Sequence, residues 1–387
     1  MPSKPPPWND PKVRALVFQV LVSLVVAFTI YYLIRNTLHN MELRGISTGF
    51  GFLSSEAGFG ITQTLVEYDE THTYGRTFLV GLLNTILVSA LGIICATVVG
   101  FVMGVARLST NWLINKIAAA YIEIFRNIPL LLQIFFWYFS VFVHLPRPRN
   151  SINIGDSIFL SNRGLYVPRP VAGEAFWVTE VAIVVAIIAV VFLVRWARKR
   201  QEETGEQFHT VWASIGILTG LPLVVFLLSG APMTLEYPEL RGFNFSGGIS
   251  MIPELAALLF ALTVYTGTFI AETVRAGIQS VSHGQTEAAR ALGLRSGPTL
   301  RLVIIPQAMR VIVPPLTSQY LNLTKNSSLA AAIGYPDLVA VFAGTTLNQT
   351  GQAVEVIAMT MAVYLTLSLT ISLFMNWYNA RMALQER

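Results

Sequence analysis

Long apolar runs alternate with short polar segments along most of the chain. The first, residues 15–34, contains no charged residue and is long enough for a helix to cross about 30 Å of hydrocarbon. Similar runs lie at residues 78–106, 117–143, 176–194, 211–229, 252–270 and 354–377. A weaker run, residues 311–334, is interrupted by Pro314, Pro315, Lys325 and Asn326. The pattern predicts an all-α polytopic membrane protein with about eight transmembrane helices.

The composition supports a membrane protein. Of 387 residues, 53% are hydrophobic and only 12% are charged, about half the charged share of a typical soluble domain. The net charge of +5 does not indicate nucleic-acid binding, because no basic stripe with interleaved aromatic residues is present. Membrane proteins collect Lys and Arg on the cytoplasmic side, and this preference explains the excess of positive charge.

Loop charges predict the orientation of the chain. With both termini in the cytoplasm, seventeen Lys and Arg residues fall inside and eight fall outside. The cluster at residues 195–200 agrees best with this orientation, and residues 147–169, with four arginines, agree least. The first run is longer than a signal-peptide core and no small-x-small cleavage site follows it, so we expect a retained helix.

Nothing in the sequence indicates catalysis. Cys95 is the only cysteine, and no two of the five histidines lie within one helical turn or one short loop, so we expect no metal site. The chain lacks a phosphate-binding Gly-x-x-x-x-Gly-Lys-[Ser/Thr] loop and a Gly-x-Ser-x-Gly nucleophile elbow. We therefore predict no catalytic residue and a chain that is not an enzyme.

One predicted helix carries small residues at steps of four. Gly92, Ala96, Gly100 and Gly104 lie on a single stripe, which lets another backbone approach closely. The stripe predicts a helix contact, either within the bundle or with a second subunit.

A polar segment at residues 272–306 separates two apolar runs. Ala288, Ala289, Ala291 and Leu292 give it one small apolar face, and Gly293 is a natural left-handed helix cap. Such a short helix is either a docking element for a partner or an ordinary cytoplasmic loop.

Three motifs carry a family resemblance. Glu287-Ala288-Ala289, followed by Gly293 and by Val303-x-Ile305-Pro306, resembles the "EAA" signature of ATP-binding-cassette (ABC) importer permeases, with Val and Ile in place of Ile and Leu. Residues 121–133, with Glu123, Arg126, Pro129 and Gln133, and residues 323–338, with Lys325 and Ser328, resemble the polar amino-acid (histidine permease-like) subfamily. The extended layout is similar to general L-amino acid transport system permeases.

The resemblance implies a type I ABC importer transmembrane fold with extra N-terminal and inserted helices. It implies an N-terminal part at residues 1–72, a permease domain at 73–380 with an insertion at about 144–247, and a coupling segment at 272–306.

The implied function is import of L-amino acids of broad polar range across the bacterial inner membrane. The implied partners are an ATPase dimer that binds the ATP, a second permease subunit expected to be a paralogue, and a periplasmic amino-acid-binding protein. The chain itself would hold no cofactor. The alternative is an ion-coupled secondary amino-acid transporter, which paired broken helices would favour; one broken segment is expected here.

The resemblance assigns ATPase coupling to Glu287, Ala288, Ala289, Gly293 and Pro306. Polar groups in the apolar runs give further candidates. Glu123 and Arg126 are spaced to form an interfacial ion pair on one helix face. Gln133, Lys325 and Asn326 are candidates for the translocation path, because an amide or ammonium group in hydrocarbon needs a partner.

Overall fold

A computed structural model of the chain describes residues 10–43, 45 and 48–382. Lys4, Arg44 and Arg387, which contribute to the charge asymmetry, lie outside these residues. The chain forms two compact units: a first unit of residues 1–134 and 258–387, and an inserted unit of residues 135–257. In the described residues, seven helices are long and apolar enough to cross a membrane, and one bent pair makes an eighth. The prediction of a helical membrane protein with about eight spans is confirmed.

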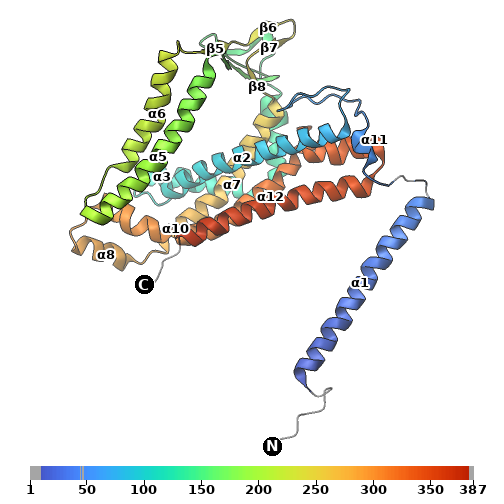
Figure 1. Ribbon diagram of the computed structural model, residues 1–387, viewed down its shortest axis with the longest axis horizontal. Helices are drawn as coiled ribbons and strands as arrows, with labels where there is room; N and C mark the ends of the chain where they lie inside the picture. The colour runs from blue at the N-terminus through green and yellow to red at the C-terminus, as the bar shows by residue number, and fades with distance from the viewer. Residues whose placement is uncertain (1–9, 44, 46–47, 383–387) are drawn as a thin grey trace, which may run out of the picture. The chain divides into compact units, whose positions relative to one another are not determined.

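The first unit is entirely helical apart from its connections (Figure 1). Its elements are α1 (Pro11–Leu43), η2 (Gly51–Ser54), α2 (Tyr74–Ala106), α3 (Trp112–Asn127), α4 (Leu130–Phe135), α7 (Pro253–Gln279), α8 (His283–Ala291), α9 (Ser296–Thr299), η5 (Leu300–Ile304), α10 (Ile305–Asn326), η6 (Ser327–Ile333), η7 (Val339–Thr346), α11 (Leu347–Thr350) and α12 (Ala353–Met382). The last residue of α4 and the first five of α7 belong to the inserted unit.

The glycine stripe of α2 is a packing surface within the first unit. A Cβ built on Gly100 would lie 2.5 Å from the side chain of Ile270 on α7, and one on Gly104 would lie 2.6 Å from the carbonyl oxygen of Ala271. A Cβ on Gly92 would lie 3.0 Å from Leu323 on α10. The predicted contact is confirmed, because only small residues allow α2 to approach these helices so closely.

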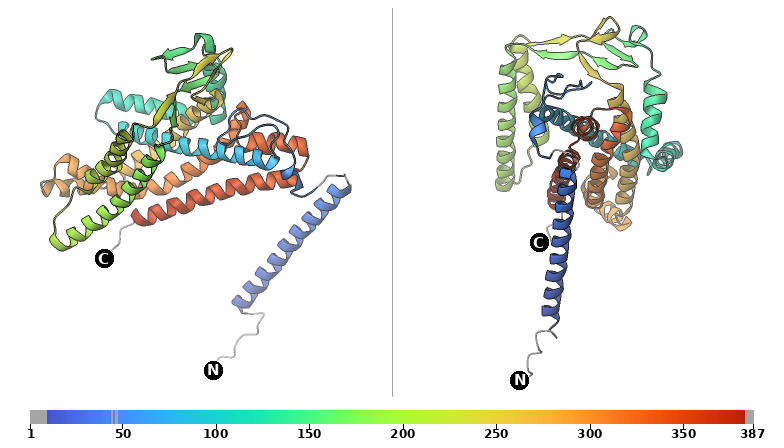
Figure 2. Two further views of the ribbon diagram at one scale, coloured as in Figure 1. Left: turned by 45° about the horizontal axis from the view of Figure 1, so that its top comes forward. Right: turned by 90° about the vertical axis from the view of Figure 1, so that its right-hand side faces the viewer.

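The predicted span at residues 117–143 is sharply bent. Two helical segments, Trp112–Asn127 and Leu130–Phe142, meet at 104° (Figure 2). By contrast, Pro314 and Pro315 lie inside α10, and a helical span runs continuously from Ser296 to Ile333. The expectation of a break at these prolines is wrong: α10 packs against α12 and α2 and accommodates both prolines, whose side chains are exposed, whereas the chain turns at Pro129.

The connection between α1 and α2 packs onto the first unit. Phe52 lies 6.2 Å from the ring of Tyr74 and 6.2 Å from the ring of Phe342, and Leu338 and Val356 complete this buried cluster. These contacts come from segments far apart in sequence. They anchor the connection, as expected for a packed loop.

The inserted unit contains strands that the apolar pattern did not predict. Its elements are η3 (Phe136–Phe142), η4 (Pro148–Asn150), β1 (Ile152–Ile154), β2 (Ile158–Ser161), β3 (Gly164–Val167), β4 (Arg169–Ala172), α5 (Phe176–Thr204), α6 (Thr210–Leu228), β5 (Met233–Glu236), β6 (Glu239–Arg241), β7 (Asn244–Ser246) and β8 (Ile249–Met251). The strands form a four-stranded sheet, β1-β2-β3-β8, and the pairs β4-β5 and β6-β7. Residues 146–173 therefore carry four strands whose partners lie partly beyond α6.

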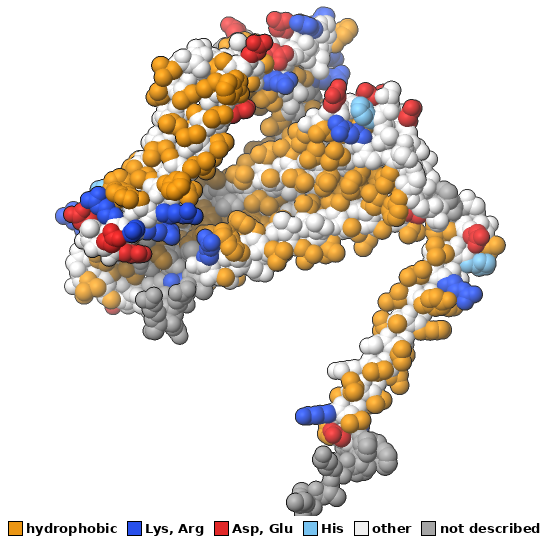
Figure 3. Space-filling model, in the orientation of Figure 1, with side chains coloured by type: hydrophobic (Ala, Val, Ile, Leu, Met, Phe, Trp, Pro, Cys, Tyr) orange, Lys and Arg blue, Asp and Glu red, His pale blue; other side chains and the backbone are white. Residues whose placement is uncertain are grey.

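Apolar side chains cover the long helices on the outside. In Figure 3, hydrophobic groups dominate the visible faces of α1, α5 and α6, and charged groups gather near the helix ends. Exposed apolar residues along α1 include Leu16, Phe18 and Phe28, each more than half exposed. These surfaces suit contact with lipid rather than water.

Candidate functional site

The predicted coupling helix is formed by α8 and ends in a specific cap. Gly293 has a φ of +79°, its N–H donates to the carbonyl of Arg290 at 2.9 Å, and the N–H of Leu294 donates to the carbonyl of Ala289 at 3.1 Å. This pair of bonds is the Schellman motif, in which a left-handed residue closes the helix. The left-handed cap expected at Gly293 is confirmed.

The outer face of α8 is open to solvent in this chain. Leu292, at the helix end, is 82% exposed, while Ala289 is buried against the following turns. A Cβ added at Gly293 would meet no atom within 4 Å. The cap therefore projects an apolar residue outward with free space around it, which suits a partner's cleft.

The segment after the cap joins α8 to the start of the membrane span. Thr299 is buried and its hydroxyl donates to the carbonyl of Arg295 at 2.9 Å, and the amide of Gln307 donates to that of Gln285 at 3.3 Å. Pro306 lies in the first turn of α10, directly after the π-helical turn η5. A displacement of α8 would therefore pass through this segment to α10.

Glu287 is an exposed residue of α8 with one side-chain partner among the described residues. It lies in the middle of α8, which begins at His283, rather than near the helix start, and its Oε1 is 3.1 Å from Nδ1 of His283. Its side chain is well exposed. Favourable interaction with the helix dipole is therefore small at this position, since that effect fades beyond the first turn.

Gln133 stabilises the bend between α3 and α4. Its Nε2 donates to the carbonyl of Phe125 at 2.8 Å and to that of Ile128 at 3.0 Å, and the side chain is buried. These are carbonyls that a helix end leaves without an intrahelical donor. The amide nitrogen is therefore satisfied by backbone carbonyls rather than by a substrate, while Oε1 of Gln133 is buried without a partner among the described residues.

Lys325 and Asn326 end α10, but Lys325 is not buried. The ammonium-bearing side chain is exposed and lines a pocket of about 530 Å³ with Ser328, Thr360 and Tyr364. The expectation of a buried lysine is corrected: this face of α10 and α12 is uncovered in the single chain. Among the candidates for the path, Lys325 is the one that lines this open pocket.

The expected ion pair of Glu123 with Arg126 does not form. Neither side chain makes an ion pair among the described residues; instead, Arg126 lines a pocket of about 320 Å³ with Glu272 of α7. Glu272 is paired with Arg275, whose Nε donates to its Oε2 at 3.0 Å. The i,i+3 spacing permitted a pair within α3, but the folded chain places Arg126 in a pocket with a carboxylate of another helix.

A buried polar cluster around Asp337 was not among the sequence candidates. Asp337 is fully buried; its Oδ1 accepts from the N–H of Ala340 at 2.8 Å and its Oδ2 from the hydroxyl of Tyr364 at 3.5 Å. The amide of Asn84, also buried, donates to the carbonyl of Pro336 at 2.8 Å. In the sequence, the signal that could have identified this cluster is a carboxylate, Asp337, that follows an apolar span.

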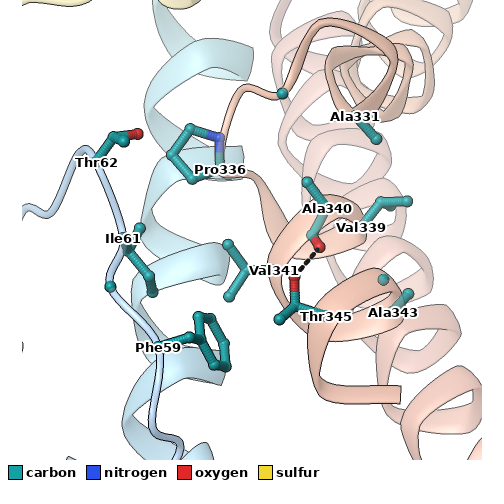
Figure 4. Close-up of a pocket in the computed structure, with 13 residues that line it drawn as sticks. Phe59, Ile61, Thr62, Ala331, Pro336, Val339, Ala340, Val341, Ala343 and Thr345 are labelled. Atoms are coloured by element: carbon teal, nitrogen blue, oxygen red, sulfur yellow. Dashed lines mark hydrogen bonds between the residues drawn. The ribbon is translucent and has the colours of Figure 1, made fainter. Parts of the chain in front are cut away.

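A pocket of about 510 Å³ lies next to this cluster (Figure 4). Phe59, Ile61 and Thr62 of the α1–α2 connection form one wall, and small residues of η7 form the other. The hydroxyl of Thr345 donates to the carbonyl of Ala340 at 3.3 Å, so it does not point freely into the cavity. Thr62 and Thr345 are the two hydroxyl residues of its lining, among apolar residues and glycines.

Comparison with known proteins adds an independent finding. The family described as "Binding-protein-dependent transport system inner membrane component" matches residues 96–384. YhdX of Escherichia coli (strain K12) is 58% identical over 98% of this chain and 96% of its own length. The general L-amino acid transport system permease protein AapQ of Rhizobium johnstonii is 51% identical over 98% and 94%, respectively. The glutamate/glutamine/aspartate/asparagine transport system permease protein BztB of Rhodobacter capsulatus is 44% identical over 98% and 96%.

Proposed function

The chain belongs to the binding-protein-dependent transport system inner membrane components, and on this premise we propose that it is the permease subunit of an ABC importer for L-amino acids. The observation that carries the proposal is the capped helix α8, which exposes Leu292 beyond the membrane spans. A short helix with an open apolar end suits docking into the cleft of an ATPase. We assign coupling to Glu287, Ala288, Ala289, Gly293 and Pro306.

ATP is bound by the partner ATPase dimer in this proposal, because the sequence has no phosphate-binding loop. A soluble amino-acid-binding protein delivers substrate from the periplasmic side. A second permease subunit, a paralogue of this chain, completes the path. Both termini then lie in the cytoplasm, as the loop charges predict.

The substrate path is assigned to the open pocket lined by Lys325, with Asn326 as its neighbour at the end of α10. A zwitterion crossing the bilayer needs polar partners for both charges, and the Lys325 ammonium group suits the carboxylate. Broad selection among L-amino acids is supported by the names of two relatives: AapQ is a general L-amino acid permease, and BztB is a glutamate/glutamine/aspartate/asparagine permease. Gln133 contributes to this path only indirectly, by fixing the bend.

The test is purification of the chain with its co-encoded subunits, followed by measurement of ATP hydrolysis with and without amino acids and binding protein. We expect hydrolysis that rises with amino acid in the complex and none in the isolated chain. Amino-acid uptake by the isolated chain, driven by an ion gradient without ATP, would instead establish the secondary transporter.

A further inference from the structure

Three arginines without acidic partners line one pocket of the inserted unit. This arginine pocket, of about 390 Å³, is formed by Arg147, Arg149, Arg163, Asn162 and Phe243 with their neighbours. None of the three guanidinium groups forms an ion pair with a carboxylate among the described residues. Several like charges around one cavity attract an anion strongly.

The pocket is held in shape by hydrogen bonds and ring packing. The N–H of Asn162 donates to the carbonyl of Pro146 at 2.9 Å, which joins the β2–β3 turn to the chain before η4. Phe245 stacks on Phe159 at 4.6 Å and packs against Tyr166 at 5.0 Å, which holds β7 against β2 and β3. The arginines therefore project from a frame that is ordered without a ligand, so little entropy is lost on binding.

An exposed aromatic ring completes the surface. Phe243 lies at the tip of the β6–β7 hairpin, is 85% exposed, and has the guanidinium carbon of Arg149 5.5 Å from its ring centre. Aromatic residues and arginine are the residue types that concentrate binding energy at protein interfaces. Binding of a single small ion to exposed charges in water contributes little favourable free energy. A protein surface can instead cover the Phe243 ring and exclude water from the arginines.

Along the chain, one predicted membrane span, α7, separates the arginine pocket from the coupling helix, so the proposed orientation places the pocket on the outer side. Strand β8 ends at Met251, α7 crosses once from Pro253 to Gln279, and α8 follows. Arginine is disfavoured on that side by the usual charge asymmetry of membrane proteins. An acidic partner on the outer side accounts for its presence there.

We propose that the arginine pocket is a docking site for an acidic surface of the soluble binding protein. This inference rests on the proposed function, since it assumes that such a protein delivers the substrate. The inserted unit would then raise the local concentration of the loaded binding protein at the permease. Carboxylates of the partner contact Arg147, Arg149 and Arg163, and an apolar patch covers Phe243.

The experiment uses the full importer complex in lipid nanodiscs and the purified, amino-acid-loaded binding protein. The triple variant R147Q/R149Q/R163Q should raise the dissociation constant, and the binding-protein concentration giving half-maximal ATP hydrolysis, by about tenfold. The maximal rate should stay unchanged, and wild-type binding should weaken with added salt more steeply than binding to the variant. Phe243→Ala should weaken docking without altering its salt dependence.

Arg241→Gln is the matched control. Arg241 belongs to the same hairpin, but its guanidinium is 3.3 Å from Glu239, so its loss should leave docking unchanged. Equal affinity of the triple variant and wild type would overturn the proposal. So would displacement of the binding protein by free glutamate, or a triple variant that differs from wild type only in binding vesicles of anionic lipid. A wild-type complex without amino-acid-stimulated ATP hydrolysis would contradict the proposed function instead.

Discussion

The backbone N–H of Gly49 donates to Oε1 of Glu355 at 2.6 Å, and this bond joins the segment after α1 to the first turn of α12. Glu355 is almost fully buried. A carboxylate at this position also suits the N-terminal end of α12, where partial positive charge gathers. The bond fixes the segment that connects the N-terminal helix to the permease fold.

Glu355→Ala should loosen this segment while Glu355→Gln keeps it. Glutamine retains an acceptor oxygen, whereas alanine leaves the N–H of Gly49 without its partner at a cost of about 1–3 kcal/mol. Hydrogen exchange of residues 48–60 in the purified complex should rise for the alanine variant. Equal exchange in the two variants and wild type would show that ring packing at Phe52 alone holds the segment.

Gly293→Asp should abolish ATP-driven uptake while the chain still inserts in the membrane. The left-handed φ at this cap disfavours a side chain by about 1 kcal/mol, and the added carboxylate would extend into the space that a partner's cleft would fill. Co-purification of the ATPase measures its attachment to the permease, and uptake in membrane vesicles measures ATP-driven transport.

Two control variants distinguish backbone strain at Gly293 from steric blocking of the partner's cleft. Gly293→Asn tolerates the left-handed conformation better, so it should retain more ATPase binding than Gly293→Asp. Glu287→Ala should be milder than either, because it removes one exposed charge in the middle of α8. If Gly293→Asp keeps both readouts at the wild-type level, α8 is not the coupling element.

Lys325→Met should reduce amino-acid uptake several-fold and leave assembly intact. The side chain is exposed in an open pocket, so the substitution removes a charge without creating a cavity or an unpaired buried group. Lys325→Arg, which keeps the charge, should retain more uptake. Uptake by Lys325→Met at the wild-type rate would remove this residue from the path.

Gln133→Met should lower the stability of the complex by about 2–4 kcal/mol. The side chains have similar volume, but methionine cannot donate to the carbonyls of Phe125 and Ile128, each of which would lose a buried hydrogen bond. Thermal unfolding of the purified complex measures the loss. A midpoint equal to wild type would mean that other contacts hold the bend.

The sequence alone determined the membrane class, the number of spans, the small-residue face of α2 and the coupling motif with its cap. These properties are local: twenty apolar residues, small residues at steps of four and a glycine after a short helix each leave a signal within one helix. Gly293 shows this best, since its left-handed conformation follows from its position after the last turn.

Tertiary structure decided which polar groups meet. Glu123 and Arg126 have the spacing of a pair, yet Arg126 faces a pocket shared with Glu272 on another helix. Two strand pairings of the inserted unit, β3 with β8 and β4 with β5, join segments that α5 and α6 separate along the chain, so no pattern within one segment could predict them. Long-range contacts depend on where whole helices and strands pack, and that packing is a property of the folded chain rather than of any one segment.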